Sequence, residues 1–188
     1  MYTRFLLLAM MIALFGCEKE YTPKPRGYFR IEFPAKDYHN LNQDFPYSFE
    51  IAGYSKVFRD TGANTEPYWI TISTPENKAD LHLSYAQIDN NLVKHIEESR
   101  RLAYDHSIKA DAIEEQLFIN PEKKVYGTIY YIEGNAASPI QFFLTDSTQH
   151  FLRGALYIRE IPNIDSIRPV VDFLRPDIIH LIETTSWK

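Results

Sequence analysis

The sequence has a single cysteine and no excess of positive charge. One cysteine excludes an internal disulfide framework and a metal cage built from thiolates alone, so the domain must be stabilised by burial of its core. The chain carries 20 Lys and Arg residues against 25 Asp and Glu residues, which gives a formal net charge of -5. A broad electrostatic contact with phosphate backbones has no basis in this composition, so we expect no nucleic acid partner.

Motifs for metal and phosphate binding are also missing. His95 is followed by Ile-Glu-Glu, as in a metalloprotease helix, but Ser99 stands where the second zinc-binding imidazole would have to be. Residues 134–139 are rich in small side chains, yet they have neither the spaced glycines of a dinucleotide loop nor the Gly-Lys-Ser/Thr of a phosphate loop. We therefore expect no metal and no cofactor.

A serine hydrolase site is the enzymatic alternative. His82 with Ser84, and Asp146 with His150, could be drawn as a catalytic set with Ser138, but the sequence contains no Gly-x-Ser-x-Gly elbow. The stretch Asp146-Ser-Thr-Gln is also what a hairpin turn needs, because an Asp side chain accepts hydrogen bonds from backbone amides two residues further on. We expect no catalytic residue and a protein that is not an enzyme, with an esterase-like hydrolase as the least favoured alternative.

Aromatic residues, in contrast, are abundant. The 188 residues include 13 Tyr and 12 Phe, and 45% of the chain is hydrophobic. Flat rings pack well on a pleated surface, so this composition favours strands. The length and the balance of apolar and charged residues are typical of one globular domain.

The N-terminus has the pattern of a secretory leader. Arg4 precedes an uninterrupted apolar run over residues 5–15. As a helix this run would be about 16 Å long, roughly half of a bilayer core, which disfavours a permanent transmembrane anchor. Residues 1–16 are therefore predicted to be a signal peptide that is removed.

Cys17 stands directly after the leader. Leu14 lies three residues before it and Gly16 directly before it, although Phe15 departs from the small residue most often found between them. This arrangement resembles the lipobox of bacterial lipoproteins, in which the Cys thiol is diacylated with fatty acids such as palmitate and Cys17 becomes the first mature residue. Several acyl chains anchor a protein stably, so we expect it to stay on a membrane. An ordinary signal peptide with an incidental cysteine is the alternative.

A polar segment follows the lipidated cysteine. Residues 17–26 include Pro23 and Pro25, which hold the chain extended. At the rise of a polyproline helix, residues 18–26 would reach about 28 Å. We interpret residues 17–26 as a tether and residues 27–188 as one folded domain.

Hydrophobic periodicity predicts the elements of that domain. The predicted strands cover residues 27–34, 47–51, 68–73, 81–85, 117–119, 125–132, 140–145 and 151–158, and residues 52–67 are expected to be a loop. A helix is predicted from Asn90 or Asn91 to about His106, and a second from Asn163, which Pro176 should kink or divide. The last four strands suit an antiparallel meander. We therefore predict an α+β fold with an antiparallel sheet covered by helices.

Two features could contact other molecules. The first is a candidate interaction surface in the two turns on either side of residues 140–145, made of Gly134, Asn135, Ala136, Ser138, Pro139, Asp146 and His150. The second is the aromatic stretch between residues 126 and 151, which could line a pocket for an apolar ligand. Aromatic residues in strands more often form core, so the pocket is the weaker interpretation.

Several strings of residues resemble the gliding motility lipoprotein GldD family of Bacteroidetes. They lie at residues 23–31, 133–147, 150–157, 162–166 and 183–188. The resemblance implies a lipid-anchored envelope protein needed for gliding and for the type IX secretion machinery, with no established enzymatic activity. The order of elements is also similar to the α/β/α sandwich of PsbP and Mog1.

These expectations combine into one hypothesis. The protein is expected to be a non-enzymatic structural or assembly component of the gliding and type IX secretion machinery. It would be held by Cys17 in the cell envelope, on the outer membrane facing the periplasm, beside other envelope proteins. The alternative is a lipoprotein that binds a small apolar or peptide ligand in a pocket at the sheet edge.

Overall fold

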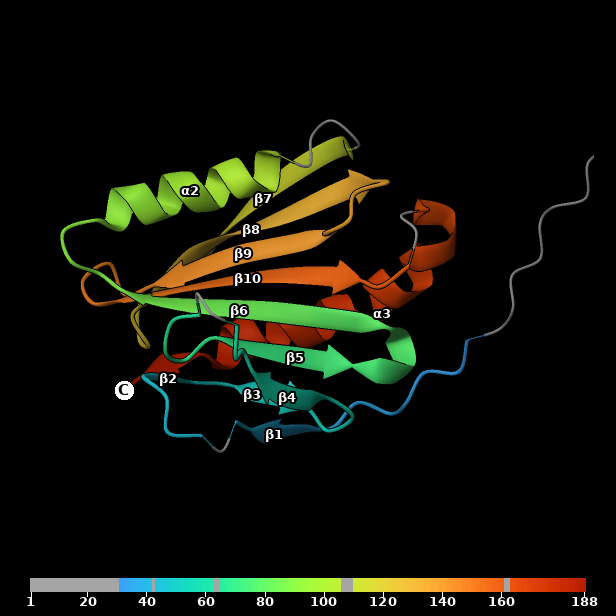
Figure 1. Cartoon of the computed structure of the whole chain (residues 1–188), viewed down its shortest axis with the longest axis horizontal. Coiled ribbons are helices and arrows are strands. Elements are labelled where there is room, and N and C mark those ends of the chain that lie inside the picture. Colours follow the sequence, from blue (N-terminus) through green and yellow to red (C-terminus); the bar gives the residue numbers. More distant parts are fainter. Residues whose placement is uncertain (1–30, 42, 63–64, 106–109, 161–162) are drawn as a thin grey trace, which may run out of the picture. The chain divides into compact units, whose positions relative to one another are not determined.

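A seven-stranded antiparallel sheet is the centre of the computed structural model, and one helix packs on each of its faces (Figure 1). The structure describes residues 31–41, 43–62, 65–105, 110–160 and 163–188. The predicted signal peptide, Cys17 and the tether lie outside the described residues. Residues 31–188 form one compact unit.

The sheet is built from the middle and later parts of the chain. Its strands, in spatial order, are β4 (Lys56–Arg59), β5 (Ile70–Thr74), β6 (Ala79–Gln87), β10 (His150–Ile158), β9 (Ile140–Thr145), β8 (Val125–Gly134) and β7 (Ala110–Asn120). The helices are α2 (Leu92–Tyr104), α3 (Ile164–Thr184) and the short 3-10 helix η2 (Pro75–Asn77). Two small pairs lie beside the sheet, β1 (Tyr38–Asn40) with β3 (Glu50–Ala52) and β2 (Tyr47–Ser48) with β11 (Ser186–Trp187).

The two faces of the sheet bury different side chains, because successive residues of a strand point to opposite sides. On β9, Phe142 and Leu144 join the large core beneath α3, whereas Phe143 joins a smaller core beneath α2. All six residues of β9 are buried. This explains why its sequence, Ile-Gln-Phe-Phe-Leu-Thr, does not alternate between apolar and polar residues.

The C-terminal helix, α3, begins after Asn163 as predicted and contains the proline that was expected to kink or divide it. A stripe of apolar residues, among them Val171, Leu174 and Ile178, packs on the sheet. Pro176 lies inside the helix, yet the helix is not divided there. We attribute its continuity to the buried side chains on both sides of the proline, which hold the backbone against the sheet although one hydrogen bond is lost. Of the two effects predicted for Pro176, a kink or a division of the helix, the division does not occur, and the kink stays a prediction.

Two other predictions at the N-terminal end of the domain are also wrong. Residues 31–34, the described part of the expected strand 27–34, have no regular structure. The expected loop over residues 52–67 contains β4, which pairs with β5 from Lys56↔Ser73 to Arg59↔Ile70. A strand as short as β4 is recruited by its neighbour, so its own sequence shows little periodicity.

The predicted fold class is confirmed. The described part of the chain is a single α+β domain with an antiparallel sheet between helices, and the meander from β7 to β10 follows the predicted order. The strand expected over residues 117–119 is longer than predicted, because β7 runs from Ala110 to Asn120.

Candidate functional site

The last residue of β8 and the loop that follows it contain five of the predicted surface residues. Gly134 has a φ of +97°, a conformation that favours glycine. Asn135 accepts a hydrogen bond from the backbone N–H of Ile164 at 2.9 Å, so the loop holds the start of α3. Ala136 and Ser138 are 2% and 0% exposed. A partner could therefore reach Asn135 but not these two buried side chains.

The other predicted surface residues lie in the turn between β9 and β10. Asp146 accepts hydrogen bonds from the backbone N–H groups of Thr148, Gln149 and His150 at 2.8 to 2.9 Å, and from the Thr148 hydroxyl at 2.8 Å. Burial by itself would raise the pKa of Asp146, but the hydrogen bonds from His150, Gln149 and Thr148 lower it to about 2. The carboxylate therefore organises the turn, as its sequence predicted.

His150 is held inside the domain. Its Nδ1 lies 2.9 Å from the Tyr85 hydroxyl, and its ring stacks on Trp187 with centroids 5.1 Å apart. Trp187 in turn donates from Nε1 to the carbonyl oxygen of Lys124. These contacts give His150 a packing role between β10, β6 and the C-terminal strand.

Ser138 is not brought together with Asp146 and His150. Ser138 precedes β9, whereas the other two residues follow it. Six residues in a strand span about 20 Å, so the serine hydroxyl lies far beyond hydrogen-bond reach of the imidazole. The catalytic set that the sequence allowed is not assembled. The wider prediction that these turns form an interaction surface stays a prediction.

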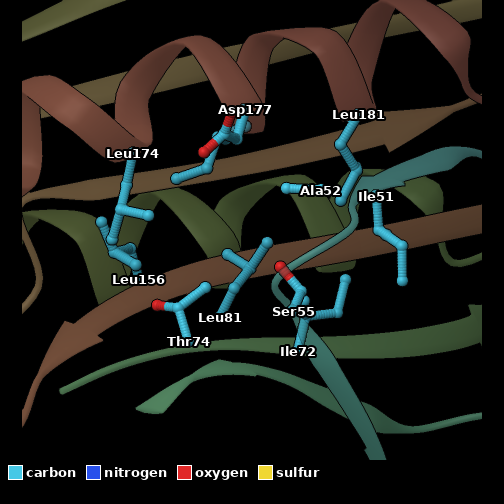
Figure 2. Close-up of a pocket in the computed structure, with 11 residues that line it drawn as sticks. Ile51, Ala52, Ser55, Ile72, Thr74, Leu81, Leu156, Leu174, Asp177 and Leu181 are labelled. Atoms are coloured by element: carbon cyan, nitrogen blue, oxygen red, sulfur yellow. The ribbon is translucent and has the colours of Figure 1, made fainter. Parts of the chain in front are cut away.

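An apolar cavity lies between α3 and the sheet. Figure 2 shows Leu174 and Leu181 pointing from α3 toward side chains of the sheet, among them Leu81. Its volume is about 40 Å³. Small-molecule sites usually occupy about 300 to 1,000 Å³, and this cavity has room for water only. It therefore does not supply the apolar ligand pocket that we considered as the alternative.

Asp177, at the rim of this cavity, joins the start of the domain to α3. Lys36 forms an ion pair with it at 2.6 Å, and the hydroxyl groups of Tyr38 and Tyr54 donate to its carboxylate. Burial and the hydrogen bond to Asp177 raise the pKa of Tyr38 to about 12. The ring of Phe33 stacks on that of Phe173, with the ring centroids 4.2 Å apart. The segment that follows the predicted tether is thus fastened along α3.

A larger cleft opens on the other face of the sheet. Its floor is formed by β5, β6 and β10, and its walls are α2 and three residues between β4 and β5, namely Asp60, Glu66 and Trp69. Arg153 lies on the floor and donates to Gln141 Oε1 at 2.5 Å. Neither residue was predicted from the sequence to belong to a site. The feature that could have revealed them is a polar side chain in the interior of each of two largely apolar strands, because such a side chain needs a polar partner when it is buried.

The outer edge of β7 is unlike the rest of the surface. Leu117 and Ile119 are 74% and 66% exposed, and they lie on the side of the sheet that α2 covers elsewhere. β7 is 11 residues long and pairs with β8, and in the part of the chain that the structure describes no strand lies on its other side. At the opposite edge, β4 has four residues and begins and ends with Lys56 and Arg59.

Membrane and metal features are absent from the described ranges. Among the described residues between 31 and 188, no helix is long and apolar enough to cross a membrane. The same residues include no group of three or more His, Cys, Asp or Glu side chains that could hold a metal ion.

Comparison with known proteins gives a similar fold and a family for this chain. The solution structure of cyanobacterial PsbP from Synechocystis sp. PCC 6803 is similar in fold, with a TM-score of 0.51 at 12% sequence identity, and the match covers 88% of this chain and 100% of that one. No curated protein matches the chain. The model of a family described as gliding motility lipoprotein GldD matches residues 18–187, nearly the whole sequence. The chain belongs to the gliding motility lipoprotein GldD family.

Proposed function

We propose that the protein is a non-enzymatic, lipid-anchored component that assembles the gliding machinery and the type IX secretion machinery on which gliding depends. The family is one of motility lipoproteins, which supports a role in the cell envelope. The catalytic set suggested by Ser138, Asp146 and His150 is separated by the length of β9, which supports a binding rather than a chemical role.

The proposed anchor is acylated Cys17, exposed when residues 1–16 are removed. Residues 17–26 would hold the domain away from the lipid headgroups, on the outer membrane and facing the periplasm. The fastening of Lys36 and Tyr38 to Asp177 supports this arrangement, because it ties the start of the described domain firmly to α3.

The observation that carries the assembly role is the long, exposed edge of β7. Such an edge presents a row of unpaired backbone N–H and C=O groups to which another strand can add. Edge strands of proteins that stay alone are usually short, charged or covered, as β4 is. β7 instead adds two exposed aliphatic side chains, Leu117 and Ile119, which a partner strand would bury.

The partner that fits this edge is an extended segment of another envelope protein, with apolar residues alternating with Lys or Arg. β7 contains Asp111, Glu114 and Glu115 and no Lys or Arg. A basic strand would therefore meet complementary charge, which selects it over an acidic one. This partner would add to the seven strands as an eighth, antiparallel or parallel to β7.

Replacement of Leu117 by Lys tests the proposal. The charge on the apolar edge should abolish capture of envelope partners in a detergent pull-down and should stop colony spreading, because desolvating a Lys in an interface is costly. Val93→Lys is the matched control, since Val93 on α2 is 67% exposed and lies away from the edge.

The two variants should be compared at equal abundance in the membrane fraction. Normal spreading and normal partner yield in Leu117→Lys would reject β7 as the assembly edge. Equal loss in Val93→Lys would also reject it, because any added surface charge would then be harmful. The turns that carry Asn135 and Asp146 would in that case be the next surface to test.

A further inference from the structure

We infer that the cleft between α2 and the side chains of Asp60, Glu66 and Trp69 binds a small zwitterionic ligand of the amino acid or short peptide class, with the ligand carboxylate on Arg153. This site is separate from the β7 edge and goes beyond the proposed assembly role.

The cleft has the size of a ligand site. Its volume is about 440 Å³, compared with about 40 Å³ for the cavity beneath α3. The larger value lies in the range of about 300 to 1,000 Å³ that small-molecule sites occupy. The cleft is a product of the fold, because α2 packs mainly against β9 and β10 and leaves the neighbouring strands β6 and β5 uncovered on that face.

Arg153 is a cation without a matching anion. Its guanidinium has five N–H donors, and its one hydrogen bond to the described residues is the bond to Gln141. None of the described carboxylates lies within ion-pair distance of it. Burial lowers the pKa of Arg153, and the nearby charges of Tyr157 and Glu98 oppose this only in part. A ligand carboxylate would supply the missing partner by accepting two parallel hydrogen bonds from the guanidinium, which is a bidentate contact.

Two further polar groups beside Arg153 are unused. Gln141 is 1% exposed, and its Nε2 has no hydrogen-bond partner among the described residues. His95 lines the cleft, and its ring stacks on that of Phe151 with centroids 5.1 Å apart. Its buried Nε2 also has no hydrogen-bond partner among the described residues. Buried polar groups nearly always have partners, so an orphaned group on the wall of a cleft indicates a site that a ligand completes. His95 is such a group, whereas Gln141 does not line the cleft and contributes through its hydrogen bond with Arg153.

The charges around the cleft select the ligand. Three carboxylates line it, from Asp60, Glu66 and Glu98, against the one guanidinium of Arg153. A simple anion such as phosphate would be attracted by Arg153 but repelled by the three carboxylates. A molecule with one carboxylate and one ammonium group satisfies both, because each charge meets its opposite.

Apolar side chains in the same cleft provide a place for the body of the ligand. Trp69, Leu102 and Phe151 line it together with the charged groups. A few polar groups among hydrophobic and aromatic walls are the usual composition of a small-molecule site. We therefore expect a preference for an apolar side chain next to the ligand carboxylate.

Calorimetric titration of the purified full chain in detergent micelles tests the inference, with the dipeptides Ala-Phe, Ala-Leu and Gly-Phe as probes. At least one probe with free termini should bind. Amidation of its C-terminus should weaken binding about tenfold or more, and so should acetylation of its N-terminus, because each removes a charged contact. Inorganic phosphate should not bind.

Variants then locate the site. Arg153→Gln should weaken binding of the free dipeptide about tenfold or more and should make the C-terminal amide bind equally well. Glu98→Gln, whose carboxylate is on the exposed wall, should weaken binding of the free dipeptide but not of its N-acetyl form. Arg168→Gln removes the same charge from exposed α3 on the other face and should bind normally.

The outcomes separate clearly. Absence of binding by all three dipeptides at about 10 mM, where a site with a Kd of about 1 mM would be roughly nine-tenths filled, overturns the inference. Phosphate binding without dipeptide binding also overturns it, because the cleft would then be a simple anion site.

If Arg153→Gln does not fold, judged by circular dichroism, Glu98→Gln and the two blocked dipeptides still decide the question. Loss of colony spreading does not enter this test, which keeps it distinct from the test at β7.

Discussion

The turn held by Asp146 can be tested by removing one charge. Asp146→Asn keeps the size of the side chain and one acceptor oxygen, but it removes the negative charge that accepts four hydrogen bonds from Thr148, Gln149 and His150. Hydrogen bonds to a charged group are stronger than those to a neutral one. We therefore expect the Asn variant to have a lower free energy of unfolding.

The size of the effect follows from the pKa of the carboxyl group. A fall from 3.8 in the unfolded chain to about 2 in the folded domain would stabilise the folded state by about 2 kcal/mol at most. The carboxylate is partly exposed, so solvent screens part of this. We expect Asp146→Asn to lower the free energy of unfolding by about 1 kcal/mol at pH 7.

The same pKa fixes the sign of the pH dependence. Because the folded state lowers the pKa, the stabilisation is present in full above the unfolded value of 3.8 and is lost as the pH falls toward about 2. The difference between the wild type and Asp146→Asn should therefore be constant from pH 7 to about pH 5 and should disappear near pH 2. The other carboxyl groups titrate in both proteins and cancel in the difference.

Urea unfolding, followed by tryptophan fluorescence, measures this difference. Trp187 stacks on His150 beside the turn and reports on it. Asp172→Asn, at an exposed position of α3, is the control and should change the free energy of unfolding by less than about 0.5 kcal/mol. An Asp146→Asn variant as stable as the wild type at pH 7, or a difference that persists undiminished at pH 2, would refute the reasoning.

Two further changes test the anchor and the core. Cys17→Ser should abolish fatty acid labelling and leader cleavage, because only the thiol accepts the diacylglycerol, and undiminished label would end the lipoprotein interpretation. Leu174→Ala should lower the free energy of unfolding by about 2 to 5 kcal/mol, since this side chain is 4% exposed and already borders a cavity that the truncation would enlarge. Val93→Ala, at an exposed position, should cost less than about 0.5 kcal/mol in the same urea titration, and an equal cost would place Leu174 outside the core.

Elements with a strong period of their own could be predicted from the sequence. The helix expected from Asn90 or Asn91 is α2, which begins at Leu92, and the strands at residues 125–132, 140–145 and 151–158 are β8, β9 and β10. The weakly periodic ends were missed. β4 and the first half of β7 depend on pairing with β5 and β8, and a strand that is formed by its neighbour leaves little trace in its own residues.

The candidate site could be predicted only in part. The Asp146 turn was recognisable because its hydrogen bonds lie within five residues. The burial of Ala136 and Ser138 was not, because small residues in a loop look the same whether a helix covers them or water does. Leu117 and Ile119 were expected to belong to a strand, but their exposure depends on where α2 ends above the sheet.

The sequence by itself determined the α+β class, the antiparallel meander and the membership of the family, since these follow from local periodicity and from strings of neighbouring residues. Only the tertiary structure decided which distant side chains meet. Arg153 reaches Gln141 through strand register, and Lys36, Tyr38 and Tyr54 converge on Asp177 from 123 to 141 residues away. Register and loop closure are set by the packing of the whole core, which no local pattern encodes.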